Sequence, residues 1–539
     1  MRWSYLAIVV LAALAVQSFA ATVAVTNTHL QTKYGTLANV YFETSSGPGS
    51  STPGTNTALI PPGTSGSYSI PQATSGYLWS PQFTGATTVS AGNWVFDFWA
   101  ASAAYSYVPV TLTNCATCAA TPDPLQLMIQ PVPSSYSTYE ASDLGNIGFC
   151  MDTLCSTRLY SWLEGCGTSA PYGACSTAST LATFWVELTS SIAASGGSLT
   201  IYMVFLPTST EFDGVYRGEA PQLSATYAAY DNGANVFNAY FNGNTPTSSF
   251  SVYTGDTLTQ TKGIPGPGGT TINAIEAKGA TGAHVPAFSF NEATSNAPLT
   301  AESSFSLNAA DKADATGVVG FVDNAAVASI KNGITAQMGY DSSYFSQAYD
   351  LGGAVTLAAN GYSGTVTTNW VYGSVTYTGS TATSWSAYIA PQLYSSTNGF
   401  SGTVANNPLS SAGSIYLGQI SGSSAIDVYY NWVRARVYLP NSALPTVSIG
   451  NSVSSNTVGV SIYVTGPTGT VVTTVASNVQ SPVLGTAEGL FSMAFAEAQV
   501  SIPASDYLSV VITASSDTCT VYWGTGQLTD FQVPVKVLT

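Results

Sequence analysis

In the stretch Trp94-Val95-Phe96-Asp97-Phe98-Trp99, the aromatic residues at 94, 96 and 98 alternate with the residues at 95, 97 and 99, which gives a period of two. Successive side chains of a β-strand point to opposite faces, so Trp94, Phe96 and Phe98 would share one face and direct it inward. The same period recurs in residues 184–188 and 508–512, between stretches rich in Gly, Pro, Asn and Ser. Apolar residues at helical spacing are scarce. The sequence therefore predicts an all-β chain built from several β-sandwich or jelly-roll domains.

The composition excludes several classes of protein. The chain has 539 residues, which is enough for about three or four domains. Only 7% of the residues are charged, and 11 basic against 27 acidic residues give a net charge of −16. This balance excludes nucleic-acid binding and polybasic docking to anionic lipid. Because acid unfolding works largely through paired carboxylates, a chain with so few charges is also expected to tolerate acidic surroundings.

The N-terminus has the pattern of a secretory signal peptide. Arg2 precedes the apolar stretch 6–16, and the small residues Ser18 and Ala20 follow, so we expect residues 1–20 to be a signal peptide cleaved after Ala20 or Ala21. The alternative is an uncleaved anchor, although the apolar stretch is shorter than the ~20 residues that a membrane span needs. No later stretch approaches that length. The pattern predicts an extracellular or cell-surface protein with no transmembrane helix in the mature chain.

The seven cysteines of an exported chain predict disulfides with one thiol left over. Six of them are neighbours in sequence, which favours three local pairs among the 15 possible pairings. The pairs would be Cys115 with Cys118, Cys150 with Cys155, and Cys166 with Cys175, leaving Cys519. Zinc is a weaker alternative, because Cys115 and Cys118 form a single CxxC with no second one following.

The two ends of the chain each carry strong strands but are short. Residues 21–104 and 453–539 each comprise fewer than about 90 residues, and the first contains long Gly- and Pro-rich loops. We therefore expect the two segments to be halves of one β-sandwich into which the middle domains are inserted. Two separate small sandwiches are the alternative.

Residues 105–240 resemble a known family in a series of short stretches. Residues 107–114, 133–147 and 159–164 resemble the opening of the domain of unknown function 2341, and residues 184–188, 201–205 and 212–216 resemble its close. Residues 218–223 and 230–237 are similar to archaeal secreted members. That family has no established reaction, so the resemblance implies a β-domain and no mechanism.

The following residues, 241–452, resemble a concanavalin A-like jelly roll of the laminin-G type. Residues 387–390, 414–418 and 426–437 look like its closing strands. Such a fold hosts many functions, so the resemblance alone does not establish sugar binding.

A search for catalytic machinery predicts no catalytic residue. Glu211-Phe212-Asp213 begins the Glu-x-Asp pattern of jelly-roll glucanases, but Val215 and Tyr216 stand where the second glutamate is needed. We interpret Glu211 and Asp213 as part of a turn, with a calcium-binding loop as the alternative. The two histidines, His29 and His284, accompany no Gly-x-Ser-x-Gly elbow. No cofactor is predicted, apart from calcium in that alternative.

The strand expected at 428–438 carries the candidate binding face. Aromatic rings stack on apolar sugar faces, and guanidinium groups hydrogen-bond hydroxyls or carboxylates. The candidate carbohydrate-binding residues on this face are Tyr430, Trp432, Arg434, Arg436 and Tyr438. The competing interpretation is that another sheet or domain covers the face.

Together these features predict a non-enzymatic secreted or cell-surface protein that mediates adhesion, glycan contact or envelope assembly. Its partners would be a glycan or other surface proteins. Exposed sheet edges leave self-assembly into a surface layer or filament as an alternative. A secreted carbohydrate-active or acid-active hydrolase with divergent carboxylates is the alternative from another class.

Overall fold

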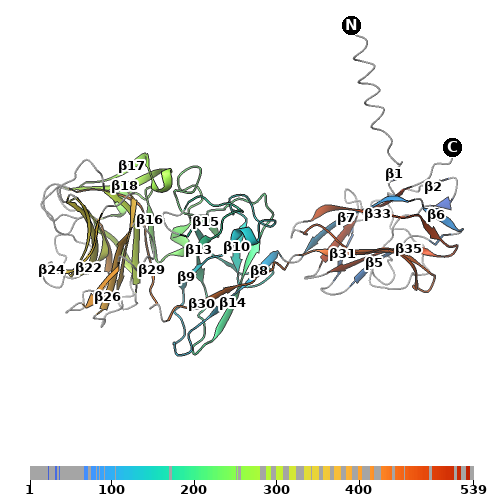
Figure 1. Ribbon diagram of the computed structural model, residues 1–539, viewed down its shortest axis with the longest axis horizontal. Coiled ribbons are helices and arrows are strands. Elements are labelled where there is room, and N and C mark those ends of the chain that lie inside the picture. The colour runs from blue at the N-terminus through green and yellow to red at the C-terminus, as the bar shows by residue number, and fades with distance from the viewer. Residues whose placement is uncertain are drawn as a thin grey trace, which may run out of the picture. The chain divides into compact units, whose positions relative to one another are not determined.

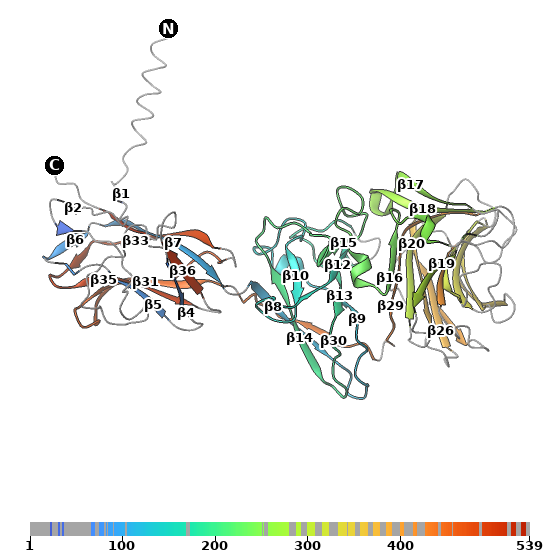
Figure 2. The same ribbon diagram turned by 180° about the vertical axis from the view of Figure 1, so that it is seen from behind.

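A computed structural model of the chain confirms the all-β prediction (Figures 1 and 2). Its one described α-helix is the single turn α2 (Gly233–Val236), and the 3-10 turns are η1 (Pro133–Ser135), η2 (Thr247–Ser249) and η3 (Pro267–Gly269). The structure describes residues 22–23, 31–32, 35–36, 66–70, 75–79, 82–83, 85–89, 91–102, 105–168, 173–250, 252, 257–279, 287–292, 299–307, 315–322, 333–341, 343–350, 356–364, 370–377, 384–390, 399–403, 413–417, 426–439, 443–454, 456–484, 488–514, 519–523 and 530–534.

The chain divides into two compact units, and the first combines both ends of the sequence. It comprises residues 1–107 and 453–539. The central strand β7 (Gly92–Ser102) pairs with three C-terminal strands: β33 (Gly489–Glu497), β36 (Cys519–Trp523) and β37 (Asp530–Pro534). In Figures 1 and 2, blue and red strands accordingly lie side by side in this unit. The remaining pairs of this sheet are β36 with β4 (Gly66–Ile70) and β37 with β1 (Thr22–Val23).

A second sheet of the terminal unit packs its apolar face on the first. Its strand order is β32 (Val471–Gln480), β31 (Val458–Thr465), β35 (Tyr507–Ala514) and β5 (Ser75–Trp79). Trp94, Phe96 and Phe98 are fully buried in the shared core with Ile462 and Val510. Two short ribbons complete the unit: β34 (Val500–Ile502) with β6 (Thr87–Val89), and β2 (Gln31–Thr32) with β3 (Gly35–Thr36).

The middle unit, residues 108–452, begins with a sandwich of two sheets. The five-stranded sheet has the order β11 (Arg158–Leu159), β10 (Ile147–Cys150), β14 (Ser198–Phe205), β8 (Ser106–Thr113) and β30 (Thr446–Ile449). The four-stranded sheet has the order β15 (Arg217–Glu219), β12 (Ser161–Cys166), β13 (Ala182–Leu188) and β9 (Leu125–Ile129). Strand β30 lies in the range expected to be jelly roll, yet it returns to pair with β8.

The rest of the middle unit contains two larger sheets. The eight-stranded sheet has the order β17 (Thr257–Pro265), β18 (Thr271–Gly279), β29 (Ile426–Val437), β20 (Leu299–Leu307), β25 (Trp370–Tyr377), β26 (Ser384–Ala390) and β27 (Gly399–Thr403), with β16 (Ala239–Asn242) also on β29. The six-stranded sheet has the order β19 (Ala287–Glu292), β28 (Gly413–Leu417), β21 (Ala315–Val322), β22 (Gly333–Asp341), β23 (Ser343–Asp350) and β24 (Thr356–Gly364).

All three expected disulfides are present, joining Cys115 to Cys118, Cys150 to Cys155 and Cys166 to Cys175. The remaining thiol, Cys519, is buried in β36. The expected signal peptide at 1–20 and the two histidines, His29 and His284, lie outside the described residues. Among the residues that are described, no helix has the length and apolarity to cross a membrane.

Candidate functional site

The candidate sugar-binding face of β29 is an internal contact of the middle unit, which corrects the expectation that it binds carbohydrate. Tyr430, Trp432 and Arg434 are 1%, 1% and 0% exposed. The Trp432 ring packs edge-on against Trp162 of β12, with ring centroids 5.8 Å apart. The alternative interpretation, a face covered by another domain, describes these three residues. Arg436 and Tyr438, farther along the same chain segment, are half-buried.

Arg434 is held among two carboxylates and several aromatic rings. Its Nε donates to Glu302 Oε2 at 2.7 Å, and one terminal nitrogen lies 3.4 Å from Glu164 Oε2. The guanidinium carbon is 4.6 Å from the ring centroid of Trp432 and 4.8 Å from that of Trp185. A guanidinium group binds carboxylates and stacks on rings with the same planar surface, so this environment suits Arg434 without any ligand.

The two carboxylates around Arg434 differ in their pKa shifts. Burial raises the pKa of Glu164 and outweighs the opposing effects of Arg434 and of Trp185, whose Nε1 donates to Glu164 Oε2 at 2.7 Å. Burial alone would also raise the pKa of Glu302, but Arg436 and Arg434 together bring it below its usual value. Neither carboxylate reaches solvent, since Glu164 is 2% and Glu302 0% exposed. These carboxylates converge, but they do so inside the protein and not in an accessible cleft.

The calcium candidates form a turn. Asp213 Oδ1 accepts backbone hydrogen bonds from Val215 at 2.9 Å and from Arg217 at 2.8 Å, and its Oδ2 lies 3.4 Å from the Arg217 guanidinium. Glu211 contributes its backbone carbonyl to the same arginine. Arg217 thus occupies the position in which a cation would lie, which favours the turn interpretation. In the described part of the chain, no group of three or more His, Cys, Asp or Glu side chains is placed to hold a metal.

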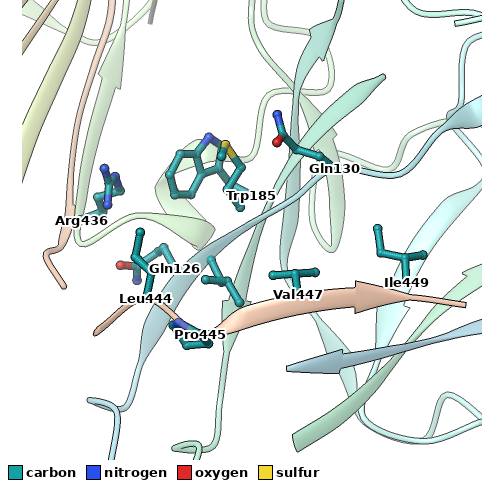
Figure 3. Close-up of a pocket in the computed structure, with 10 residues that line it drawn as sticks. Gln126, Gln130, Trp185, Arg436, Leu444, Pro445, Val447 and Ile449 are labelled. Atoms are coloured by element: carbon teal, nitrogen blue, oxygen red, sulfur yellow. The ribbon is translucent and has the colours of Figure 1, made fainter. Parts of the chain in front are cut away.

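A pocket of about 520 Å³ opens between the two sheets of the first sandwich. We call it the β9/β30 slot, because β9 and the segment leading into β30 form its walls (Figure 3). Gln126 and Leu444 lie at one end, and Gln130 and Ile449 lie at the other. Its lining residues are Gln126, Leu127, Met128, Gln130, Trp185, Arg436, Leu444, Pro445, Val447 and Ile449.

The wall formed by β9 is an open sheet edge. Among the described residues β9 pairs only with β13, and the amide of Ala182 donates to the carbonyl of Pro131 in that ladder. Residues opposite each other in an antiparallel pair alternate between bonded and unbonded positions. Leu127 and Ile129 therefore share the bonding position of Pro131 and direct their backbone groups towards β13. The backbone N–H and C=O groups of Gln126, Met128 and Gln130 point outward, to the slot.

The opposite wall repeats this geometry. Strand β30 pairs with β8, and the amide of Gly450 donates to the carbonyl of Pro109 in the same ladder. By the same alternation Thr446 and Ser448 face β8, and Val447 and Ile449 direct their backbone groups outward. Two open edges, one from each sheet of the sandwich, therefore border the slot.

The Gln126 side chain carries a buried amide donor that has no partner among the described residues. Its side chain is 3% exposed, and its Oε1 accepts a hydrogen bond from the amide of Val437 at 3.1 Å. No described atom accepts from its Nε2. A buried donor left unpaired costs about 1–3 kcal/mol, which a hydrogen bond to an acceptor would offset. Gln130 Nε2, by contrast, donates to Thr183 Oγ1 at 3.1 Å.

The slot was not among the sites expected from the sequence. Leu125–Ile129 has the composition of a strand, but nothing in these residues shows that β9 ends at the edge of a sheet. The edge arises because the next strand in space, β30, joins the other sheet. Only the pairing of residues far apart in sequence reveals this arrangement.

No family model matches the chain. It is 39% identical over 357 residues to a protein of Sulfolobus islandicus rod-shaped virus 1 described as "Uncharacterized protein 562". The match covers 64% of this chain and 59% of that protein, so the chain spans about three fifths of its relative.

Several solved structures share part of the fold at low similarity. One is a carbohydrate esterase of the bacteriophage phi24B, with a TM-score of 0.28 and 11% identity over 38% of this chain and 99% of that one. Another is a lectin from Bauhinia forficata, with a TM-score of 0.23 and 9% identity over 37% of this chain and 98% of the lectin. Scores this low support no argument about function.

Proposed function

We propose that this chain is a non-enzymatic extracellular binding protein that acts in adhesion or envelope assembly and holds its ligand, a glycan or another surface protein, in the β9/β30 slot. The observation that carries the proposal is the slot itself. It is a concave site bordered by two open sheet edges, with a buried, unpartnered amide donor at Gln126. Binding sites are commonly concave, largely apolar and provided with a few fixed polar groups.

The slot combines these features. Leu127, Met128, Val447 and Ile449 supply apolar surface, and the outward backbone groups of β9 and β30 supply donors and acceptors. The polar groups are fixed by the sheets, so little conformational entropy is lost when a ligand binds.

The placement of the carboxylates supports a non-enzymatic role. A hydrolase that uses two carboxylates needs both of them beside the bond that it cleaves. Glu164 and Glu302, which do converge, are buried and bonded to arginines. Neither carboxylate lines the slot.

The disulfides support an extracellular location. Disulfides form and persist in oxidising compartments and are rare in reducing ones. Three of them lie in the first sandwich of the middle unit, which also contains the slot.

Binding and turnover assays on the intact chain test the proposal. The probes are a glycan array and a displayed library of random hexapeptides, with hydrolysis of ester, oligosaccharide and casein substrates measured between pH 2 and 7. We expect saturable binding without turnover. Binding should be lost in Leu444→Trp, because Leu444 is an exposed residue at the rim and the larger side chain fills the slot. Binding should be retained in Leu490→Trp, which makes the same substitution at an exposed residue of the terminal unit. Hydrolysis, or binding that Leu444→Trp leaves unchanged, would overturn the proposal.

A further inference from the structure

The geometry points to an extended polypeptide strand as the ligand of the β9/β30 slot, added to the open edge of β9 by main-chain hydrogen bonds. This inference rests on the proposed function and deepens it by naming the class of partner. Strand addition needs an exposed sheet edge that supplies affinity and side-chain pockets that supply specificity. The slot contains both features.

The spacing of the free backbone groups matches a polypeptide. Outward N–H and C=O groups occur at every second residue of β9, at Gln126, Met128 and Gln130. An added strand directs its own N–H and C=O groups towards β9 at the same two-residue interval. The five residues 126–130 span about 16 Å at ~3.3 Å per residue, so the edge can hold a segment of about five residues. β9 is a better template than the β30 wall, because Pro445, the residue that precedes β30, has no N–H to donate.

The walls also predict the side chains of the added strand. Leu127 is buried between the sheets, and Val447 and Ile449 are half-buried on the opposite wall, so one face of the strand would meet apolar surface. The side chains of Gln126 and Gln130 lie on the other face of β9, on either side of Met128, and give that face two polar amide groups. Alternate side chains of a strand point to opposite faces, so the ligand should alternate apolar and polar residues.

The aromatic residue of the slot favours a polypeptide over a glycan. Sugars are held by stacking on an open ring face, but Trp185 is only 3% exposed. The guanidinium groups of Arg434 and Arg436 each lie 4.8 Å from its ring centroid. Arg436 itself is bonded to Glu302 at 2.8 Å. The stacking surface of Trp185 is therefore already in use, while the backbone edge of β9 is open.

The test compares two substitutions at one outward position. Met128→Pro removes an N–H that faces the slot and leaves the bonds from β9 to β13 in place, and proline is tolerated at a sheet edge. Met128→Leu keeps that N–H and has a similar volume. Hexapeptides selected from the random library on the intact chain should alternate apolar and polar residues. They should bind Met128→Pro at least about tenfold more weakly, because the ring removes a hydrogen bond and obstructs the ladder. Met128→Leu keeps the N–H, so it should weaken hexapeptide binding much less than Met128→Pro does.

The outcomes separate this inference from the proposed function. If Leu444→Trp abolishes glycan binding and no hexapeptide is enriched, the inference of an added polypeptide strand is overturned, while the slot remains a binding site. Hexapeptide binding of equal strength in Met128→Pro and Met128→Leu would also overturn the inference of strand addition to β9. A loss of binding in Met128→Pro counts as support only when its thermal unfolding matches that of Met128→Leu. If Met128→Pro does not fold, hydrogen exchange of the Met128 amide is measured in the intact chain with and without the hexapeptide. An amide that the hexapeptide does not protect overturns the inference of strand addition.

Discussion

Arg434 of β29 lies with a terminal guanidinium nitrogen 3.4 Å from the Glu164 carboxylate of β12, although 270 positions separate the two residues in sequence. The contact joins the eight-stranded sheet to the first sandwich within the middle unit. Both side chains are buried; Arg434 also bonds Glu302, and Glu164 also accepts from Trp185, so the contact belongs to a buried polar network. The pair, with Glu302, therefore makes the two parts of the unit interdependent.

Replacing Arg434 should destabilise the middle unit strongly. Arg434→Met leaves two buried carboxylates without their shared cation, and breaking a buried ion pair costs about 3–5 kcal/mol. Urea unfolding followed by tryptophan fluorescence measures the loss, because Trp162, Trp185 and Trp432 surround the guanidinium.

Arg436→Met serves as the matched control for this prediction. The Arg436 side chain is 15% exposed and bonds Glu302 but not Glu164. Arg436→Met should therefore lower the free energy of unfolding less than Arg434→Met does. Combining Arg434→Met with Glu164→Gln should recover part of the stability, since the Glu164 carboxyl left without Arg434 is then neutral, while Glu302 keeps its bond to Arg436. A loss under about 1 kcal/mol for Arg434→Met would contradict the role assigned to this cluster.

Local patterns in the sequence predict the strands well. The alternation in 94–99 predicts a strand with Trp94, Phe96 and Phe98 inward; all three are fully buried in β7, while the residues between them are half-buried. The disulfides followed from the same local reasoning, because each pair closes a short loop. Such features depend on residues that are close in sequence.

Features that depend on distant residues could not be predicted in the same way. The composition of β29 is equally suited to a sugar-binding face and to a covered one, and the covering residues, such as Trp162 and Glu164, come from another part of the chain. The β9/β30 slot depends on which strand lies last in each sheet. Periodicity assigns a strand and its buried face, but it does not assign the neighbouring strand.

The stability of the protein should fall as the pH rises from about 4.5 to about 8. Burial raises the pKa of Glu140 to about 8 and those of Glu187 and Glu219 to about 7. A carboxyl whose pKa is raised on folding binds a proton more tightly in the folded state, so its contribution is present below the unfolded pKa and is lost as the pH passes the folded one. Urea midpoints at pH 5, 6.5 and 8.5 test this prediction. A midpoint highest at pH 8.5 would contradict it.

Glu140→Gln should remove a large part of this pH dependence. Glu140 is 5% exposed, and neither carboxyl oxygen has a hydrogen-bond partner among the described residues. At pH 8.5 the variant should exceed the parent chain in stability by roughly 1–3 kcal/mol, because the amide stays neutral. Asp152→Asn is the control: burial acts to raise the pKa of the half-buried Asp152 carboxyl, but hydrogen bonds from Ser156 and from backbone amides together lower it. Equal midpoints for Glu140→Gln and the parent chain at pH 8.5 would refute the role of Glu140.

Cys519 should be inert towards thiol reagents until the terminal unit unfolds. Its side chain is 2% exposed, and burial raises the pKa of the thiol to about 12. The thiolate is the reactive species, so both effects suppress reaction at neutral pH. Titration with Ellman's reagent should detect no thiol in the native protein and one in guanidinium chloride. A count above one in the denaturant would show that a disulfide does not form in solution.

The terminal unit should fold on its own when its two segments are joined directly. β7 pairs on one side with β33 and on the other with β36 and β37, so a chain ending near residue 104 lacks every strand that pairs with β7 in the described part of the unit. The junction is short, because the amide of Tyr107 donates to the carbonyl of Ser454 at 3.2 Å and the reverse bond measures 2.9 Å. A polypeptide joining residues 21–104 to 453–539 should therefore unfold in one cooperative transition, with matching midpoints by circular dichroism and fluorescence. Each segment alone should show no such transition, because Trp94, Phe96 and Phe98 would lose the apolar partners that bury them. Cooperative folding of either isolated segment would mean that the two ends form separate domains.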